Sequence, residues 1–114
     1  MTLPREGKLL RVFIGESDRD GHRPAYQAIV ELARREGLAG ATVLRGLAGF
    51  GHSSRIHTAS ILRLSEDLPI VVEIVDTAER IDAFLPKLEP LVGGGLVTLE
   101  RVEVLAYRAK DPAR

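Results

Sequence analysis

Two short runs of apolar residues constrain the fold of this chain more than any other feature. Residues 9–14 read Leu-Leu-Arg-Val-Phe-Ile, and residues 70–75 read Ile-Val-Val-Glu-Ile-Val. The second run is rich in β-branched residues and the first is partly β-branched, and both have the length of a strand, so each predicts a β-strand. Successive side chains of a strand point to opposite faces, and here both faces are apolar except at one charged residue in each run. Each strand is therefore expected in the middle of a sheet, covered on both sides.

Helical and further strand patterns surround these two runs. Apolar residues at helical spacing predict a first helix over residues 24–36, which Gly37 closes by taking up a left-handed conformation. A second helix is predicted after Asp76, which forms a capping arrangement with Glu79. The remaining patterns predict strands at residues 41–50, with a bulge at Gly46, and at 59–64 and 97–107, and a polar loop at 51–58.

The order strand, helix, strand thus occurs twice, which predicts an α+β fold. Two split βαβ units (βαββαβ) with right-handed crossovers form a ferredoxin-like antiparallel sheet with both helices on one face. The other face of the two central strands is apolar as well, so we expect an oligomer in which sheets pack face to face. Glu73 lies in the middle of a central strand, and we expect a cross-strand partner for it, such as an arginine at the subunit interface.

Composition narrows the class of protein. The chain has 114 residues, which predicts a single domain that spans residues 1–114. Its core is expected at residues 8–108, with short flexible termini. Lys plus Arg and Asp plus Glu both number 16, so there is no general attraction to nucleic acid. The absence of cysteine fits a reducing compartment, and no apolar run is long enough to span a bilayer. We therefore expect a cytoplasmic protein without direct membrane insertion.

Several segments of the chain resemble a known family. Residues 40–43 and 49–51 resemble the second strand and the start of the long T-loop of PII signal proteins. Residues 8–108 resemble the PII-like group known as domain of unknown function 190 (DUF190, or UPF0166). The segments that carry this closer resemblance are Gly-Glu-Ser-Asp at 15–18, Gly-Leu-Ala-Gly-Phe-Gly at 46–51, Ile-His-Thr-Ala-Ser at 56–60, Leu-Ser-Glu-Asp-Leu-Pro at 64–69 and Gly-Leu-Val-Thr-Leu-Glu at 95–100.

The resemblance implies a ferredoxin-like homotrimer that senses a small effector and signals through the 51–58 loop. PII proteins bind adenine nucleotides in clefts between subunits, at the base of the T-loop and at a glycine-containing loop before the last strand. The matching positions in this chain are Gly49, Phe50 and Gly51, and Gly93, Gly94 and Gly95. PII proteins continue the second loop with a phosphate-binding lysine, where this chain has Leu96. AMP or ADP is therefore expected over ATP. The sequence does not distinguish whether the protein target is a transporter, a channel or an enzyme.

Side chains near these loops supply further candidate ligands. A guanidinium grips phosphate through paired hydrogen bonds, which makes Arg45, Arg55, Arg101 and Arg108 candidates for an anion. His52 and His57 lie in the polar loop and could contact a ligand or a partner protein. By analogy with the family, Glu16 and Ser17, just after the first central strand, are also expected near the ligand.

Two alternatives remain open from the residues alone. One is a small oligomeric ferredoxin-like enzyme that uses His52 or His57 with a carboxylate as acid and base. The other is a metal-binding module of the same fold. The chain shows neither a third metal ligand near the histidines nor the strained turn of a serine hydrolase, so we predict no catalytic residue and no resident metal or required cofactor.

Overall fold

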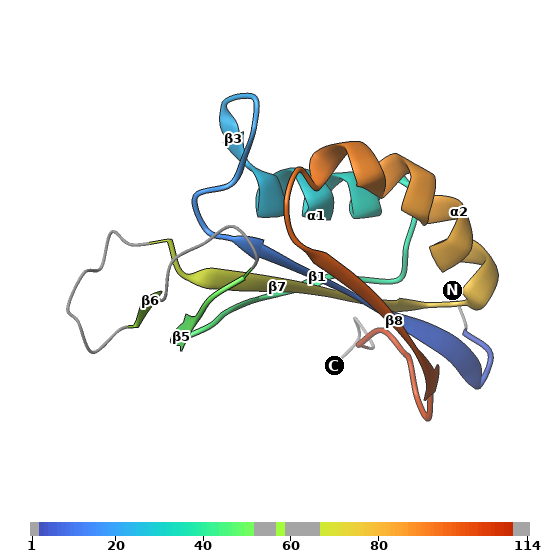
Figure 1. Cartoon of the computed structure of the whole chain (residues 1–114). Coiled ribbons are helices and arrows are strands. Elements are labelled where there is room, and N and C mark those ends of the chain that lie inside the picture. The colour runs from blue at the N-terminus through green and yellow to red at the C-terminus, as the bar shows by residue number, and fades with distance from the viewer. Residues whose placement is uncertain (1–2, 52–56, 59–66, 111–114) are drawn as a thin grey trace.

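A four-stranded antiparallel sheet forms the frame of the protein, with strand order β4-β7-β1-β8. The computed structural model describes residues 3–51, 57–58 (backbone only) and 67–110. Both long helices, α1 and α2, lie on one face of this sheet (Figure 1). The predicted ferredoxin-like α+β fold is confirmed.

The sheet is built from two long central strands and two edge strands. The central strands are β1 (Glu6–Gly15) and β7 (Pro69–Asp76), and the edge strands are β4 (Thr42–Arg45) and β8 (Leu96–Glu103). The remaining elements are α1 (Ala25–Arg35), α2 (Ala78–Leu88), the 3-10 helix η2 (Glu89–Leu91), the two-residue strands β2 (Arg19–Asp20) and β3 (Arg23–Pro24), and the pair β5 (Ala48–Gly49) and β6 (His57–Thr58).

The core lies between the two central strands and the helices. Leu10, Val12 and Ile14 of β1 stand directly opposite Ile74, Val72 and Ile70 of β7, and all six side chains are buried. Helix α1 contributes Ile29, and α2 contributes Ile81, Phe84 and Leu88. Burying side chains of this size is worth roughly 1.5–3 kcal/mol each, so this layer supplies most of the drive to fold.

Helix α1 ends as the sequence predicts. Gly37 has φ = 78°, a conformation that glycine adopts without strain. The amide of Leu38 donates to the carbonyl oxygen of Ala33 at 3.0 Å, and that of Gly37 donates to Arg34 at 3.1 Å. These two bonds are the pair that defines a Schellman ending, and they direct the chain toward β4.

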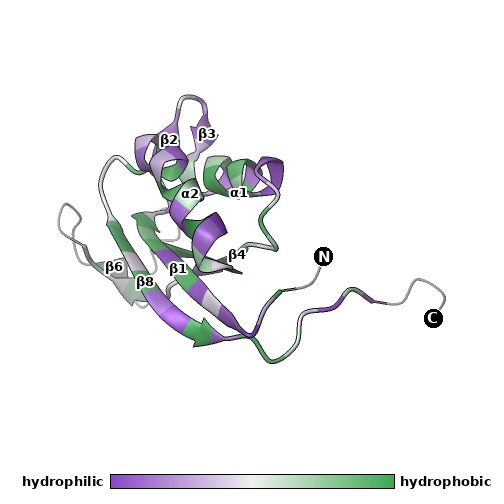
Figure 2. Ribbon diagram, turned by 90° about the vertical axis from the view of Figure 1, so that its right-hand side faces the viewer, coloured by the Kyte–Doolittle hydropathy of each residue, from purple (hydrophilic) through white to green (hydrophobic). Residues whose placement is uncertain are grey.

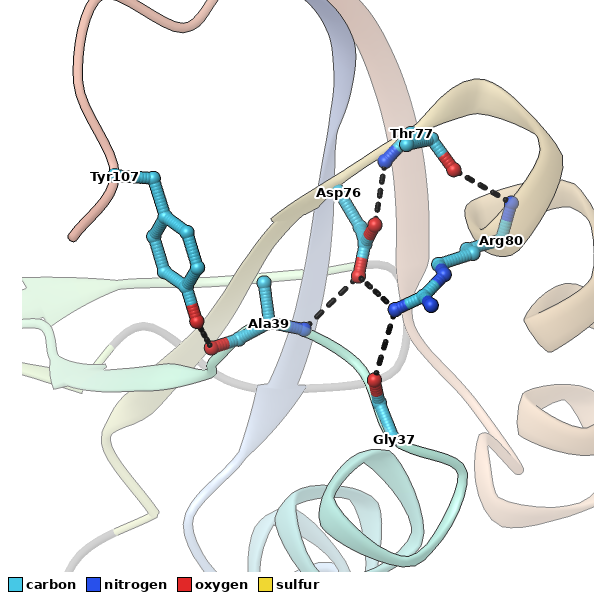
Figure 3. A network of polar contacts seen from close by, with 6 residues as sticks. All are labelled: Gly37, Ala39, Asp76, Thr77, Arg80 and Tyr107. Atoms are coloured by element: carbon cyan, nitrogen blue, oxygen red, sulfur yellow. Dashed lines mark hydrogen bonds and ion pairs between the residues drawn. The ribbon is translucent and has the colours of Figure 1, made fainter. Parts of the chain in front are cut away.

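The start of α2 differs from the prediction. Thr77, not Asp76, is the capping residue, and its hydroxyl oxygen accepts from the amide of Arg80 at 3.1 Å. The Asp76 side chain instead turns into the protein, where it is 1% exposed. It accepts from the backbone amides of Ala39 at 2.9 Å and Thr77 at 2.6 Å (Figure 3). The two oxygens of Asp76 are engaged by Ala39 and Thr77, and the amide of Arg80 is capped by the Thr77 hydroxyl instead.

Three predicted strand boundaries also need correction. The strand predicted at 41–50 divides into β4 and β5, because the chain leaves the sheet at Gly46, and no single bulged strand forms there. The last strand ends at Glu103 rather than at Tyr107. Residues 57–58, predicted as loop, form β6 and pair with β5. The strand predicted at 59–64 lies outside the described residues.

We expect Asp76→Ala to destabilise the fold strongly. The substitution leaves two backbone amides without their acceptor, and an unsatisfied buried donor costs about 1–3 kcal/mol, so the loss should be roughly 2–4 kcal/mol. Asp82→Ala is the matched control, because its bond to Lys8 at 2.8 Å is exposed and worth less than about 1 kcal/mol. Urea unfolding at one protein concentration measures both. Equal stability of the two variants would contradict the assigned role of Asp76.

Candidate functional site

Four chain segments meet at one end of the sheet, which we call the loop-base end. It is formed by the end of β1, the end of β4, the start of β7 and the start of β8, and the β5–β6 ribbon extends from it, to the left in Figure 1. In an antiparallel sheet the ends of some strands and the starts of others share an edge. Glu16, Ser17, Arg45 and both glycine-rich segments therefore lie at the same end.

The turn after β1 is fixed to the segment before β7. The amide of Glu16 donates to the carbonyl oxygen of Leu68 at 2.8 Å, and the amide of Ser17 donates to Asp67 Oδ1 at 2.7 Å. A Cβ atom on Gly15 would lie 2.5 Å from Asp67 Oδ2, so only glycine leaves this carboxylate in place. These two hydrogen bonds fix the backbone of this turn against the segment before β7, while the Glu16 side chain accepts from Arg45.

Arg45 and Glu16 form an ion pair across this end of the sheet. Arg45 Nη2 donates to Glu16 Oε2, and the arginine side chain is 63% exposed while that of Glu16 is 25% exposed. An exposed pair of this kind contributes little to stability. Its effect is to hold one cationic group at the mouth of the 51–58 loop, where a ligand anion could replace the carboxylate.

The chain beyond β4 is shaped by glycines that fit against Pro69. The amide of Gly46 donates to the carbonyl oxygen of Pro69 at 2.7 Å, and a Cβ atom at Gly46 would approach the proline ring to 2.7 Å. Gly49, with φ = 155°, pairs with His57 in the β5–β6 ribbon. Phe50 follows with a side chain that is 71% exposed. A large apolar side chain is therefore presented to solvent at the loop mouth.

The three consecutive glycines before β8 are not equivalent. A Cβ atom on Gly95 would lie 2.4 Å from the carbonyl oxygen of Phe13, so glycine is needed there for β8 to lie beside β1. Gly93 and Gly94 are exposed, and an added Cβ would meet nothing within 4 Å at either one. Packing thus explains Gly95 but leaves the bare backbone of the other two available to a ligand.

The structure does not bring every predicted site residue to this end. The triple glycine and Gly49 both lie there, but at opposite edges of the sheet, separated by β1 and β7. Arg101 is opposite Lys8 at the far end of the sheet, and Arg108 follows Tyr107 in the C-terminal segment. His52 and Arg55 lie outside the described residues, and His57 is described only as backbone in β6.

A hollow of about 730 Å³ lies at the far end of the sheet, away from the loop-base end. Residues 102–107, from the end of β8 into the C-terminal segment, line it together with Ala41 and Thr42. Leu9, Glu73 and Val75 of the central strands line it as well. Tyr107 closes it by donating its hydroxyl proton to the carbonyl oxygen of Ala39 at 2.7 Å (Figure 3). The hollow has no part in the arrangement predicted for the glycine-rich loops.

The sheet face without helices, which we call the open face, carries the predicted partner of Glu73. Arg11 Nε donates to Glu73 Oε2 at 2.8 Å, and Arg11 Nη1 donates to Glu100 Oε1 at 2.5 Å. The hydrogen bond to Glu73, with the charges of both carboxylates, outweighs desolvation and raises the pKa of Arg11 above its ordinary value. These contacts thus favour the cationic form that a guanidinium already has at neutral pH.

Sequence reasoning missed the residues that brace the loop-base end. Asp67 and Pro69 hold the turns after β1 and β4, yet in the sequence they look like ordinary turn residues. Their partners are about 50 and 23 positions away in the chain. Within the described ranges, no group of three or more His, Asp or Glu side chains is placed to hold a metal.

Membrane-spanning helices are also absent from the described part of the chain, where no helix combines the necessary length and hydrophobicity.

Comparison with known proteins gives one family and one fold. Residues 7–104 match the family DUF190, described as "Uncharacterized ACR". A UPF0166 protein of Aquifex aeolicus is 42% identical over 98 residues, which cover 86% of this chain and 92% of the relative.

Two similar solved structures are PII-like proteins. One is CPII from Thiomonas intermedia K12, a nitrogen regulatory PII-like protein bound to ADP, AMP and bicarbonate, with a TM-score of 0.65 and 19% identity over 87% of this chain and 88% of that chain. The other is a PII-like protein from Thermus thermophilus, with a TM-score of 0.61 and 21% identity over 87% and 89%. The chain therefore belongs to the DUF190 (UPF0166) family and has a PII-like fold.

Proposed function

We propose that this protein is a PII-like regulator, not an enzyme, that binds an adenine nucleotide at the loop-base end and signals to a protein partner through the 51–58 loop. The observation that carries the proposal is that an exposed arginine, Arg45, and two glycine-rich segments lie at the same end of the sheet. CPII, which shares the fold, is bound to ADP and AMP, and this supports the class of ligand.

The proposed ligand site is completed by a neighbouring copy. Within one chain the triple glycine and Gly49 lie at opposite edges of the sheet, too far apart to contact one small molecule together. Packing of open faces in a homotrimer would bring the glycine loop of one copy toward the loop base of the next. Arg101 and Arg108, which lie far from Arg45 within a chain, could then contribute from a neighbour.

The residue that follows the triple glycine favours a ligand of low charge. Leu96 stands there at the start of β8, and Arg45 is the cation held at the end of β4. Each phosphate of a nucleotide adds negative charge that needs a donor or a cation. AMP or ADP is therefore proposed over ATP. A bound nucleotide that favours one arrangement of the 51–58 loop would change its contact with a cytoplasmic target, such as the cytosolic side of a transporter or channel.

Isothermal titration calorimetry with AMP, ADP, ATP and cyclic AMP tests the ligand. We expect AMP or ADP to bind more tightly than ATP, and Arg45→Met to weaken binding roughly tenfold, because it removes a charge-assisted bond to phosphate. Arg35→Met is the control, since Arg35 lies exposed in the last turn of α1, in the helix layer on the other side of the sheet from the open face. The nucleotide proposal fails if none of the four ligands gives heat.

Alanine at the two last glycines separates binding from folding. Gly94→Ala meets no neighbouring atom, so we expect stability within about 0.5 kcal/mol of the parent and weaker nucleotide binding, because the methyl group covers the bare backbone. Gly95→Ala would force the Phe13 carbonyl to move, and should lower the free energy of unfolding by roughly 1–3 kcal/mol. Unchanged affinity in the Gly94 variant would exclude this loop from the site.

Native mass spectrometry tests the assembly. Three chains of 12.5 kDa should appear as one species of about three times that mass. The physical reason is the open face, whose apolar side chains would otherwise stay in contact with water. A monomer at micromolar concentration would rule out both the trimer and a ligand site shared between copies.

A further inference from the structure

A charged row lies in the middle of the open face, between apolar side chains. It consists of Arg11 of β1, Glu73 of β7 and Glu100 of β8, joined by the two hydrogen bonds described above. Figure 2 shows a hydrophilic stretch along β8, with hydrophobic positions before and after it. The row therefore crosses three neighbouring strands, with Thr98 opposite Arg11, Thr42 opposite Glu73 and apolar side chains on either side.

The register of the sheet places an apolar band beside this row. The band runs across the sheet with one residue from each of the four strands, each paired with the next. In order across the sheet these are Leu44, Val71, Phe13 and Leu96. Two of them, Leu44 and Leu96, are 49% and 57% exposed. On the other side of the row, Leu9 stands opposite Val75. Any partner that covers the apolar band must also remove water from the charged row.

Removing water from ions is unfavourable unless each ion has a partner. The row meets this condition before any partner arrives, because one guanidinium already bonds both carboxylates. The described exposures of Arg11 and Glu73, 33% and 30%, show that they are partly shielded within one chain. The pair is thus prepared for burial, and it would be strongly unfavourable to bury with Arg11 removed.

The row also has unused hydrogen-bonding capacity of both kinds. The guanidinium carries more N–H donors than its two described bonds use, and each carboxylate keeps a second oxygen. A surface that offers spare donors and spare acceptors side by side is complementary to another copy of itself. An unrelated apolar surface would leave both unsatisfied, and this points to a second copy of the chain as the occupant.

We propose that the charged row of Arg11, Glu73 and Glu100 determines which chains associate through the open face. The apolar band drives association, and the row restricts it to partners with a matching row. This inference rests on the self-association proposed above. Glu103 at the end of β8 and Tyr107 of the C-terminal segment line the same hollow as Glu73, so they are titratable neighbours of the row.

Native mass spectrometry at pH 7 on three variants tests the proposal. Arg11→Met should weaken association on the order of 100-fold, because two carboxylates then lose their partner in a surface that excludes water. Arg11→Met combined with Glu73→Gln and Glu100→Gln removes all three charges and should restore assembly. Arg5→Met is the matched control, because it breaks an exposed pair with Glu103 outside the row, and it should assemble like the parent chain.

A mixing experiment tests selectivity directly. The parent chain and an isotope-labelled uncharged triple variant are unfolded together and refolded. Native mass spectrometry then measures the masses of the assemblies. We expect separate assemblies of each chain, since an uncharged row facing a charged one leaves the spare donors and acceptors of the charged row without charged partners. Statistical mixing, or an Arg11→Met variant that assembles as tightly as the parent, would overturn the role of the row while leaving self-association intact. A monomeric parent chain would instead overturn the proposed assembly, and the role of the row with it.

Discussion

The pairing of β1 with β7 determines where the other elements of this protein lie. Eight residue pairs from Lys8–Asp76 to Gly15–Pro69 keep the two strands in one register. A shift by one residue would move the buried side chains to the open face and expose the helix-binding layer. The same register brings the turn after β1 against the start of β7, and so sets the position of Glu16 beside Arg45. The core and the candidate site therefore both depend on the register of β1 against β7.

Covering only one face of this sheet has a consequence for function. The helices bury the side chains of one face, while the other keeps an apolar band together with Arg11, Glu73 and Glu100. Apolar residues in place of the ion pairs would stabilise the assembly equally well, because the cost of desolvating the ions offsets much of their attraction. Charges in that position are better explained by selectivity between partners. The face that drives assembly is thus also able to limit it.

Much of the fold could be predicted because it rests on local signals. The two β-branched runs, the helical spacing before Gly37 and the resemblance of five short segments to DUF190 proteins all follow from neighbouring residues. Glu73 could even be assigned an arginine partner, since a lone carboxylate in an apolar strand needs one. The capping residue of α2 was predicted wrongly, because Asp76 and Thr77 are both good capping residues and only a distant loop decides between them.

The sequence by itself determined the order of the elements, the apolar character of both faces of the central strands, and the glycines that could approach a ligand. Only the tertiary structure decided which of those glycines packing requires, because the carbonyl of Phe13 that excludes a side chain at Gly95 lies on another strand. It also decided that Arg45 and Arg101 lie at opposite ends of the sheet within one chain. Contacts between segments far apart in the sequence depend on sheet register, and register is a property of the whole fold.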